Sequence, residues 1–245
     1  MPSVSFDPIA ARYDATRGGE GRGRVIADLL RPWLPAAGAV VEIGVGTAVV
    51  ATALATTSGP IMGLDVSAAM LDIAAQRFPG PLLQADARAV PLRAGSVDAI
   101  TAIWVLHLVG DRPAVFAECH RVLRRGGRLL GVIFDRSRRV DDPRVLELEL
   151  RFRHRADALE NLQPAAEAAG FRTAHIEPIP AFARPATAAQ TADLLEQRTW
   201  SWLWDIPPDA WAADVVPVIE ALRREPDQAA AGTQQLAHQL VVWER

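Results

Sequence analysis

The sequence predicts an α/β protein with a doubly wound, mainly parallel β-sheet of about seven strands and helices on both faces. Short apolar runs alternate along the chain with segments whose apolar residues recur at helical spacing. The runs are apolar nearly throughout, which is typical of strands buried on both faces of a parallel sheet. A late pair of such runs follows the alternating part, so we expect a mixed sheet.

The predicted elements alternate from the first apolar run to the end of the chain. The segments expected to form a strand, in some cases with the turn after it, are 39–46, 60–67, 81–87, 96–106, 128–135, 171–179 and 235–245. The segments expected to be helical are 24–34, 48–57, 67–78, 111–127, 156–170 and 187–225. Ser67 and Asp111 have side chains suited to helix N-caps, and Gly126 is placed to end the helix that Asp111 begins.

One segment, 143–155, fits two kinds of element. Its leucines alternate as in a strand, whereas Glu147 and Arg151 are spaced for a helical ion pair. We favour a helix.

Composition limits the kind of protein more than its chemistry. The chain has 245 residues, half of them hydrophobic, and a net charge of −3. So weak a charge favours neither a nucleic-acid backbone nor an anionic membrane as a partner. Cys119 is the one cysteine, so no internal disulfide can form, and no apolar run is long enough to span a membrane. The first residues also lack the pattern of a signal peptide, so we expect a cytoplasmic protein.

The domain organisation expected from this length is one domain over residues 1–245. Residues 1–35 would form an N-terminal helical cover, and the glycine-rich stretch 17–23 would serve as its hinge or as a plain linker. Residues 187–225 would form a helical insertion that acts as a lid.

The most informative motif is VVEIGVGTA, residues 40–48. A buried strand ends in the acid Glu42, and two glycines, Gly44 and Gly46, precede a helix. Glycines let the backbone approach a ligand without a Cβ clash, and open α/β sheets bind ligands at the carboxyl ends of their strands. The next two strands also end in acids, Asp65 and Asp86.

These three acids distinguish between two ligands. A dinucleotide site has a third glycine where this chain has Val49, and a diphosphate would lie poorly beside Glu42. S-adenosylmethionine (SAM) has no phosphate and has a sulfonium and an amino group, which acidic residues suit. Asp65 can accept hydrogen bonds from ribose hydroxyls, and Asp86 can accept one from the adenine amino group. The pattern therefore favours SAM over a dinucleotide, with solvated strand-end carboxylates as the alternative.

The motifs VVEIGVGTA, GLDVSAAML, LLQADARAVPLRAGSVDAI and LRRGGRLL resemble, in order, those of Rossmann-like class I SAM-dependent methyltransferases. The likeness is greatest to the small-molecule group called methyltransferase type 11, or UbiE-like. Phe6, Asp7, Ala10, Tyr13 and Asp14 are similar to the entry motif of that group. The resemblance covers roughly residues 5–134 and weakens beyond, apart from the tryptophan-rich stretch and the last strand.

The resemblance implies a set of cofactor contacts. Gly44, Gly46 and Thr47 would line the methionine part, with Glu42 near the amino group. Asp65 would hold the ribose, Val66 and Met70 would lie by the nucleoside, and Asp86 and Ala87 would contact the adenine edge. The Ile103 carbonyl would face the amino group, Tyr13 would close over the ligand, and Arg17 would pair with its carboxylate. The implied residues are Tyr13, Arg17, Glu42, Gly44, Gly46, Thr47, Asp65, Val66, Met70, Asp86, Ala87 and Ile103.

Two positions depart from the family pattern. Ala48 replaces a common third glycine, and we expect binding to survive because a methyl group costs little if φ there is helical. Trp104 stands where the family often has a polar residue or histidine, which removes any family-wide catalytic role from this position.

The acceptor side is less clear. His107, after the fourth strand, is a candidate general base, with packing against the lid as the alternative. Trp200, Trp202 and Trp204 cannot share one helical face, so we favour an aromatic substrate pocket that includes Trp104, Trp200 and Trp204 over core packing. No metal-ligand spacing is present.

The function that the resemblance implies is in-line methyl transfer from SAM to an O, N or C atom of a small molecule, with S-adenosylhomocysteine (SAH) as product, for example in natural-product tailoring. Three alternatives stay open: a SAM-binding protein with another catalytic or regulatory role, a nicotinamide-dependent reductase, and a scaffold with an inactive site.

Overall fold

The computed structural model describes most of the chain, and at a few positions it describes the backbone without the side chain. The described residues are 6–56, 59–135, 141–152, 158–228 and 230–245. The chain divides into two compact units. Unit 1 comprises Met1–Phe134, Ala156–Ile179 and His238–Arg245, and unit 2 comprises Asp135–Arg155 and Pro180–Ala237.

Across the described residues, seven strands form one sheet in the order β3-β2-β1-β4-β5-β7-β6. Strands β1 to β5 are parallel, and β7 pairs antiparallel with β5, with Phe134 opposite His238. The strands are β1 Val40–Ile43, β2 Ile61–Asp65, β3 Leu82–Gln84, β4 Val97–Ile103, β5 Leu123–Phe134, β6 Arg172–Thr187 and β7 Ala231–Glu244. The predicted mixed Rossmann-like sheet is confirmed.

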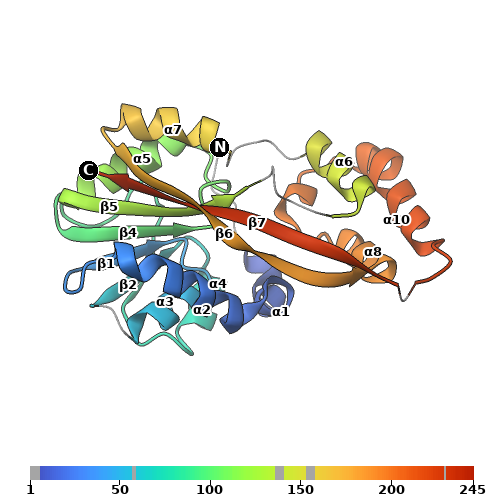
Figure 1. The fold of residues 1–245 in the computed structure, drawn as a ribbon, viewed down its shortest axis with the longest axis horizontal. Helices are drawn as coiled ribbons and strands as arrows, with labels where there is room; N and C mark the ends of the chain where they lie inside the picture. Colours follow the sequence, from blue (N-terminus) through green and yellow to red (C-terminus); the bar gives the residue numbers. More distant parts are fainter. Residues whose placement is uncertain (1–5, 57–58, 136–140, 153–157, 229) are drawn as a thin grey trace. The chain divides into compact units, whose positions relative to one another are not determined.

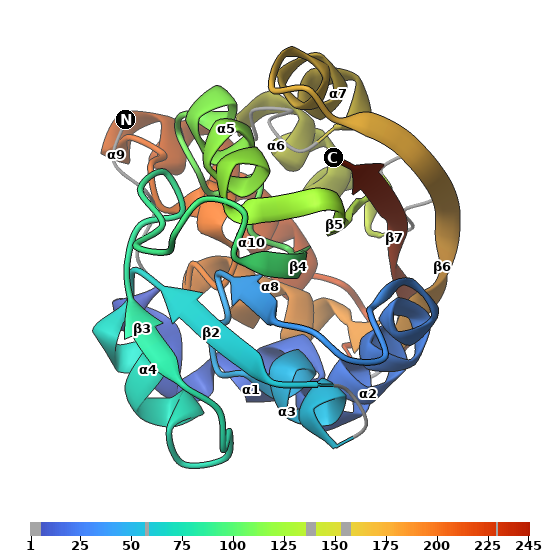
Figure 2. The same ribbon diagram turned by 90° about the vertical axis from the view of Figure 1, so that its left-hand side faces the viewer.

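The helices of unit 1 cover both faces of the sheet (Figures 1 and 2). Helices α2, α3 and α4 lie on one face, and α5 and α7 lie on the other. The N-terminal elements are η1 Asp7–Arg12, α1 Tyr13–Arg17, α2 Gly19–Leu30 and η2 Arg31–Trp33. The later helices are α3 Val49–Ala55, α4 Ala68–Ala74, α5 Arg112–Val122 and α7 Leu159–Ala168.

The predicted N-caps both form. The Ser67 hydroxyl accepts from the Met70 amide, and the Asp111 carboxylate accepts from the Ala114 amide. The prediction that Gly126 ends the same helix is wrong, because α5 ends at Val122. Leu123 is extended, fully buried and paired with Val97 in the sheet, so the strand begins before the glycine is reached.

Unit 2 is mainly helical. Its helices are α6 Pro143–Phe152, α8 Ala188–Glu196, η4 Ser201–Leu203, α9 Pro208–Ala210, η5 Trp211–Val215 and α10 Val216–Arg223. The segment that fitted two elements is a helix as favoured over its described residues 143–152, where Val145 and Leu148 are buried while Leu150 is exposed. Such burial follows helical spacing and not alternation.

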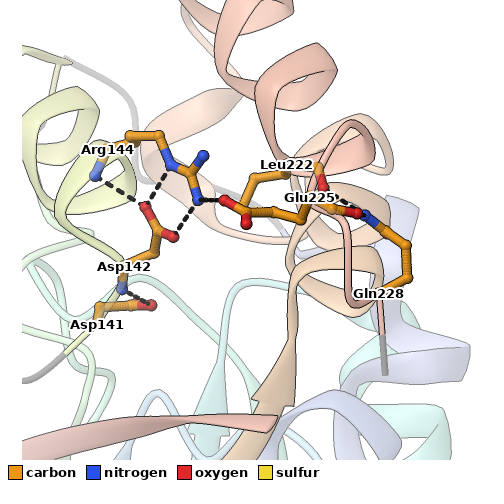
Figure 3. A network of polar contacts seen from close by, with 6 residues as sticks. All are labelled: Asp141, Asp142, Arg144, Leu222, Glu225 and Gln228. Carbon is orange, nitrogen blue, oxygen red and sulfur yellow. Dashed lines mark hydrogen bonds and ion pairs between the residues drawn. The ribbon is translucent and has the colours of Figure 1, made fainter. Parts of the chain in front are cut away.

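A polar network joins the start of α6 to the segment after α10 (Figure 3). The Arg144 guanidinium donates to both carboxylate oxygens of Asp142, at 2.9 and 2.7 Å, and to Glu225 at 3.0 Å. The Gln228 amide donates to the carbonyls of Leu222 and Glu225. The network therefore fixes helix ends within unit 2.

Candidate cofactor and acceptor pocket

A pocket opens in unit 1 at the carboxyl ends of the parallel strands. It encloses about 620 Å³, including its open mouth. Its lining is Phe6, Tyr13, Gly44, Gly46, Leu64, Asp65, Val66, Met70, Ala85, Ala87, Ile103, Trp104, Val105, Leu108 and Val109. Open α/β sheets bind ligands at this edge.

The turn after β1 forms one wall, and it needs glycine at Gly44. Gly44 has φ +66°, and a Cβ there would lie 2.4 Å from Cγ2 of Val105. Gly46 has φ +54°, and a Cβ there would meet no atom within 4 Å. The first glycine therefore allows close packing, and the second leaves open space beside the backbone.

Ala48 differs from the expectation. Its φ is +61° and its ψ is 26°, so it begins α3 in the left-handed conformation. The condition on which we expected little cost, a helical φ, is not met. An L-residue with a Cβ is strained there by about 1 kcal/mol relative to glycine, because Cβ approaches the following carbonyl oxygen.

Asp65 is the carboxylate that lines the pocket. Its Oδ2 accepts from the Gly46 amide at 2.8 Å, and its Oδ1 accepts from the Ser67 amide at 2.9 Å. Burial raises the pKa of Asp65 above its ordinary value, although these amide hydrogen bonds oppose the shift. A carboxylate has about four acceptor positions, so both oxygens keep capacity for a ligand.

Glu42 lies beneath the lining and is 2% exposed. Its Oε2 is buried and has no hydrogen-bond partner. Burial, and then the negative charge of Asp65, raise the pKa of Glu42 from 4.5 to about 8. A buried polar atom of this kind calls for a partner, and a nearby cation would stabilise its ionised form.

Asp86 does not appear in the lining, although its neighbour Ala87 does. The Arg88 guanidinium donates to both Asp86 oxygens, at 3.0 and 2.7 Å, and the Arg88 amide donates to Oδ1. The predicted adenine contact would therefore share this carboxylate with Arg88.

The N-terminal segment contributes two rings, Phe6 and Tyr13, which meet edge to face at 5.7 Å between centroids. Two acids attach the segment to the sheet unit. Asp7 accepts from the Ser67 hydroxyl, and Asp14 accepts from the Thr47 hydroxyl at 2.6 Å. Asp14 also accepts from Arg77 at 2.6 Å, with both side chains about a quarter exposed.

Thr47 therefore contacts Asp14 and is not part of the lining. The side chain of Arg17 lies outside the described atoms, so its predicted pairing is not placed. The lining residues that we did not predict are Phe6, Leu64, Ala85, Val105, Leu108 and Val109. Phe6 was visible in the entry motif, whereas the others look like ordinary apolar residues of strands and turns.

The residues predicted to contact the acceptor lie in different places. Trp104 lines the pocket, whereas His107 packs edge to face on Phe134 with the centroids 5.5 Å apart. Within unit 2, Trp200 is buried and stacks on Trp202 at 5.9 Å. The indole Nε1 of Trp204 donates to the Arg198 carbonyl at 2.7 Å. These positions favour packing for His107 and Trp200.

The fold and its pocket define a Rossmann-like protein with a cavity at the carboxyl ends of its parallel strands, and comparisons with known proteins narrow this class. Residues 41–131 match the family model described as a methyltransferase domain. The chain is 36% identical over 134 residues to the ubiquinone/menaquinone biosynthesis C-methyltransferase UbiE of Desulfotalea psychrophila, a match that covers 50% of this chain and 54% of that protein. The chain spans about half the length of the curated UbiE-type relatives it matches.

Solved structures give the same fold over nearly the whole chain. The [4+2]-cyclase SpnF has a TM-score of 0.63 at 18% identity, with 98% of this chain and 93% of that chain covered. A SAM-dependent methyltransferase of Thermotoga maritima, described as a possible histamine N-methyltransferase, has a TM-score of 0.59 at 19% identity, with 98% and 97% covered.

Residues 41–131 thus match a methyltransferase domain, and about half of the chain is similar to UbiE-type methyltransferases. The predicted fold is confirmed, and these matches support the predicted family and SAM as cofactor, whereas none of the proteins named above supports the nicotinamide-dependent reductase. Among the described residues, no helix is long and apolar enough to cross a membrane.

Proposed function

We propose that the protein transfers the methyl group of SAM to a small, uncharged acceptor. The observation that carries this proposal is the pocket itself. Asp65 is held at its wall by two backbone amides, and the rest of the lining is apolar apart from the Tyr13 hydroxyl, the Trp104 indole N–H and backbone groups.

The residues present fit the cofactor. The open space beside Gly46 leaves room for a ligand against the backbone, and Oε2 of Glu42 lacks a partner that an amino group nearby would supply. Asp65 would accept from the ribose hydroxyls, and Val66, Met70 and Ala87 would pack on the nucleoside. The carbonyl of Ile103 would complete the contacts to the amino group.

When bound, SAM supplies an activated methyl group on a sulfonium. The work of this chain is then to orient the two reactants and to exclude water. Phe6 and Tyr13 would shield the site from solvent, as the predicted cover of residues 1–35 requires. Residues 187–225, within unit 2, would serve as the predicted lid.

The acceptor class follows from the wall after β4. Trp104, Val105, Leu108 and Val109 add no charge to the pocket, and His107 is not part of its lining. A planar apolar ring packs well on such a wall, whereas a cation or phosphate would lose its hydration without a partner. A ring of the naphthoquinol class is our first candidate, in keeping with the quinone-pathway relatives.

The test is SAH formation, measured by mass spectrometry, from SAM and either 1,4-naphthoquinol under anaerobic conditions or histamine. We expect turnover with the naphthoquinol, none with histamine, and binding of SAM and SAH by calorimetry. Turnover with histamine in place of the naphthoquinol would refute the acceptor class. Binding of SAM without SAH formation from either acceptor would favour the alternative of a non-methylating SAM protein. Absence of binding by folded protein would refute the proposal as a whole.

A further inference from the structure

Trp104, on the pocket wall, has an uncommon backbone conformation. It directly follows β4 and has φ +52°, in the left-handed region. Bulky residues are strained in this region and persist only where the surrounding structure holds them. The contacts of Trp104 therefore show what holds this part of the wall.

Two residues from distant parts of the chain contact the indole. The guanidinium carbon of Arg22, on α2, lies 3.5 Å from the ring centroid of Trp104, a cation–π contact. The imidazole of His238, on β7, meets the same indole edge to face at 5.4 Å. Arg22 and His238 are also joined, with Nη2 of Arg22 3.2 Å from Nε2 of His238.

The chemistry of this contact sets the direction of the hydrogen bond. Arginine has donors and no acceptor, so Nε2 of His238 accepts from Arg22. The side chain of His238 is fully buried, so the ring has a fixed place between Arg22 and Trp104.

Both partners are themselves held firmly. Helix α2 packs so closely on α3 that a Cβ at Gly23 would lie 2.6 Å from the Val49 carbonyl oxygen. The backbone that carries Arg22, next to Gly23, is therefore held against α3. His238 is paired in the sheet opposite Phe134, whose ring lies 4.8 Å from the imidazole.

We propose that Arg22 and His238 are positioning residues that hold Trp104 in its left-handed conformation and so set the acceptor wall of the pocket. The proposal rests on the proposed function, which makes this wall the side of the pocket that contacts the acceptor. Neither residue appears in the pocket lining, so both would act through Trp104. Together they would determine the affinity for a planar acceptor while leaving the cofactor contacts on β1, β2 and β3 in place.

The experiment compares Arg22→Met and Arg22→Lys with Arg24→Met, a matched control on the same helix. Arg24 is 69% exposed and forms an ion pair with Glu20 at 3.9 Å. His238→Leu removes the acceptor nitrogen, and His238→Gln restores an acceptor oxygen. Each protein is tested for the KM towards the naphthoquinol, the Kd for SAH and the near-ultraviolet circular dichroism of Trp104. That last signal is isolated by subtracting the spectrum of the same protein with Trp104→Phe.

We expect Arg22→Met and His238→Leu to diminish the Trp104 signal and to raise the KM towards the naphthoquinol about ten-fold or more, since a displaced group near the reaction can cost about a hundred-fold. The Kd for SAH should stay within about three-fold, because its contacts are unchanged. His238→Gln should recover most of the loss. Arg22→Lys should recover little, because an ammonium lacks the planar face that stacks on indole.

A Trp104 signal and a KM in Arg22→Met equal to those of Arg24→Met would overturn the proposal. Equal loss in His238→Leu and His238→Gln would overturn the role of the hydrogen bond. If Arg22→Met does not fold, Arg22→Lys and the two His238 variants decide. If the wild type does not methylate naphthoquinol, the acceptor class fails, and the Trp104 signal with the Kd for SAH still tests the positioning.

Discussion

The two units hold their carboxylates in different ways. In unit 1, Asp65, Asp98 and Glu118 each accept from a backbone amide that belongs to another part of the chain, and Asp98 and Glu118 pair with arginines in addition. In unit 2, acids on the helices mainly pair with arginine side chains. Arg151 pairs with Asp214, and Arg223 pairs with Asp193 and Glu196.

The two kinds of partner differ in how exactly they position a carboxylate and in how much they stabilise the fold. An amide that is fixed in the fold gives a carboxylate one position, which a ligand contact needs. Pairs between long, exposed side chains add about 0–1 kcal/mol and fix little. We infer that unit 1 contains the exact geometry of the site, whereas the stability of unit 2 depends on its apolar core.

The largest expected effect is on that core. Trp200 is 8% exposed and packs among the buried residues of unit 2. Trp200→Ala should lower the free energy of unfolding of this unit by about 3–5 kcal/mol, measured by denaturant titration. The Kd for SAH should not change. A matching loss of SAH affinity would show that the cofactor site depends on Trp200, contrary to the comparison.

The next effect is on the site. Asp65→Ala should weaken SAH binding by at least about a hundred-fold, since hydrogen bonds to a charged group are worth about 1.5–3 kcal/mol each. Calorimetry measures the Kd. Asp72→Ala, an exposed position on α4, is the control and should bind as the wild type does. Equal affinities in the two variants would remove Asp65 from the cofactor site.

These two regions also differ in what the sequence alone could predict. The strand-end acid Asp65 and the glycines Gly44 and Gly46 were found because their roles depend on local backbone geometry after a buried strand. The same holds for the N-caps Ser67 and Asp111. The alternation of strand-like and helix-like segments was sufficient to predict the sheet.

Other features depend on backbone conformations and side-chain contacts that no sequence pattern indicated. The left-handed φ of Ala48 reverses the expected small cost. The local pairing of Asp86 with Arg88 and the long-range pairing of Thr47 with Asp14 change which groups face the pocket. For the tryptophan-rich stretch we favoured a pocket over core packing, whereas the burial of Trp200 favours the core.

A third prediction concerns pH. Glu42 has its pKa raised from 4.5 to about 8 in the folded protein by burial, so the folded state retains a proton that the unfolded state loses. The associated stability is present below pH 4.5 and is lost as pH rises towards about 8. In this range the free energy of unfolding should fall by up to about 1.4 kcal/mol per pH unit. Glu42→Gln, a neutral isostere, should remove this slope in urea titrations between pH 5 and 8.

Glu118 provides the opposite control in the same unit. Hydrogen bonds from Arg121 hold its pKa below the ordinary value. Its contribution is present above pH 4.5 and is lost as pH falls, so Glu118→Gln should flatten the acid side and leave the slope above pH 5 unchanged. An unchanged slope in Glu42→Gln would show that Glu42 is ionised in the folded protein.

The smallest expected effect is at Ala48, a non-glycine residue of unit 1 in the left-handed conformation. Ala48→Gly should raise the free energy of unfolding by up to about 1 kcal/mol, because glycine adopts φ +61° without a Cβ clash. The strain removed from the folded state should exceed the conformational entropy that glycine adds to the unfolded state. The measurement is a denaturant titration of both proteins, together with the Kd for SAH.

Ala51→Gly is the control, and its expected change in the free energy of unfolding has the opposite sign. Ala51 is fully buried inside α3, one turn after Ala48, so the same change there should lower the free energy of unfolding by about 1 kcal/mol or more. Opposite signs at the N-cap Ala48 and at Ala51 inside the helix would point to backbone conformation, since both methyl groups are fully buried. If both variants are destabilised alike, the left-handed start of α3 is not under strain, and the turn after β1 accepts alanine as readily as glycine.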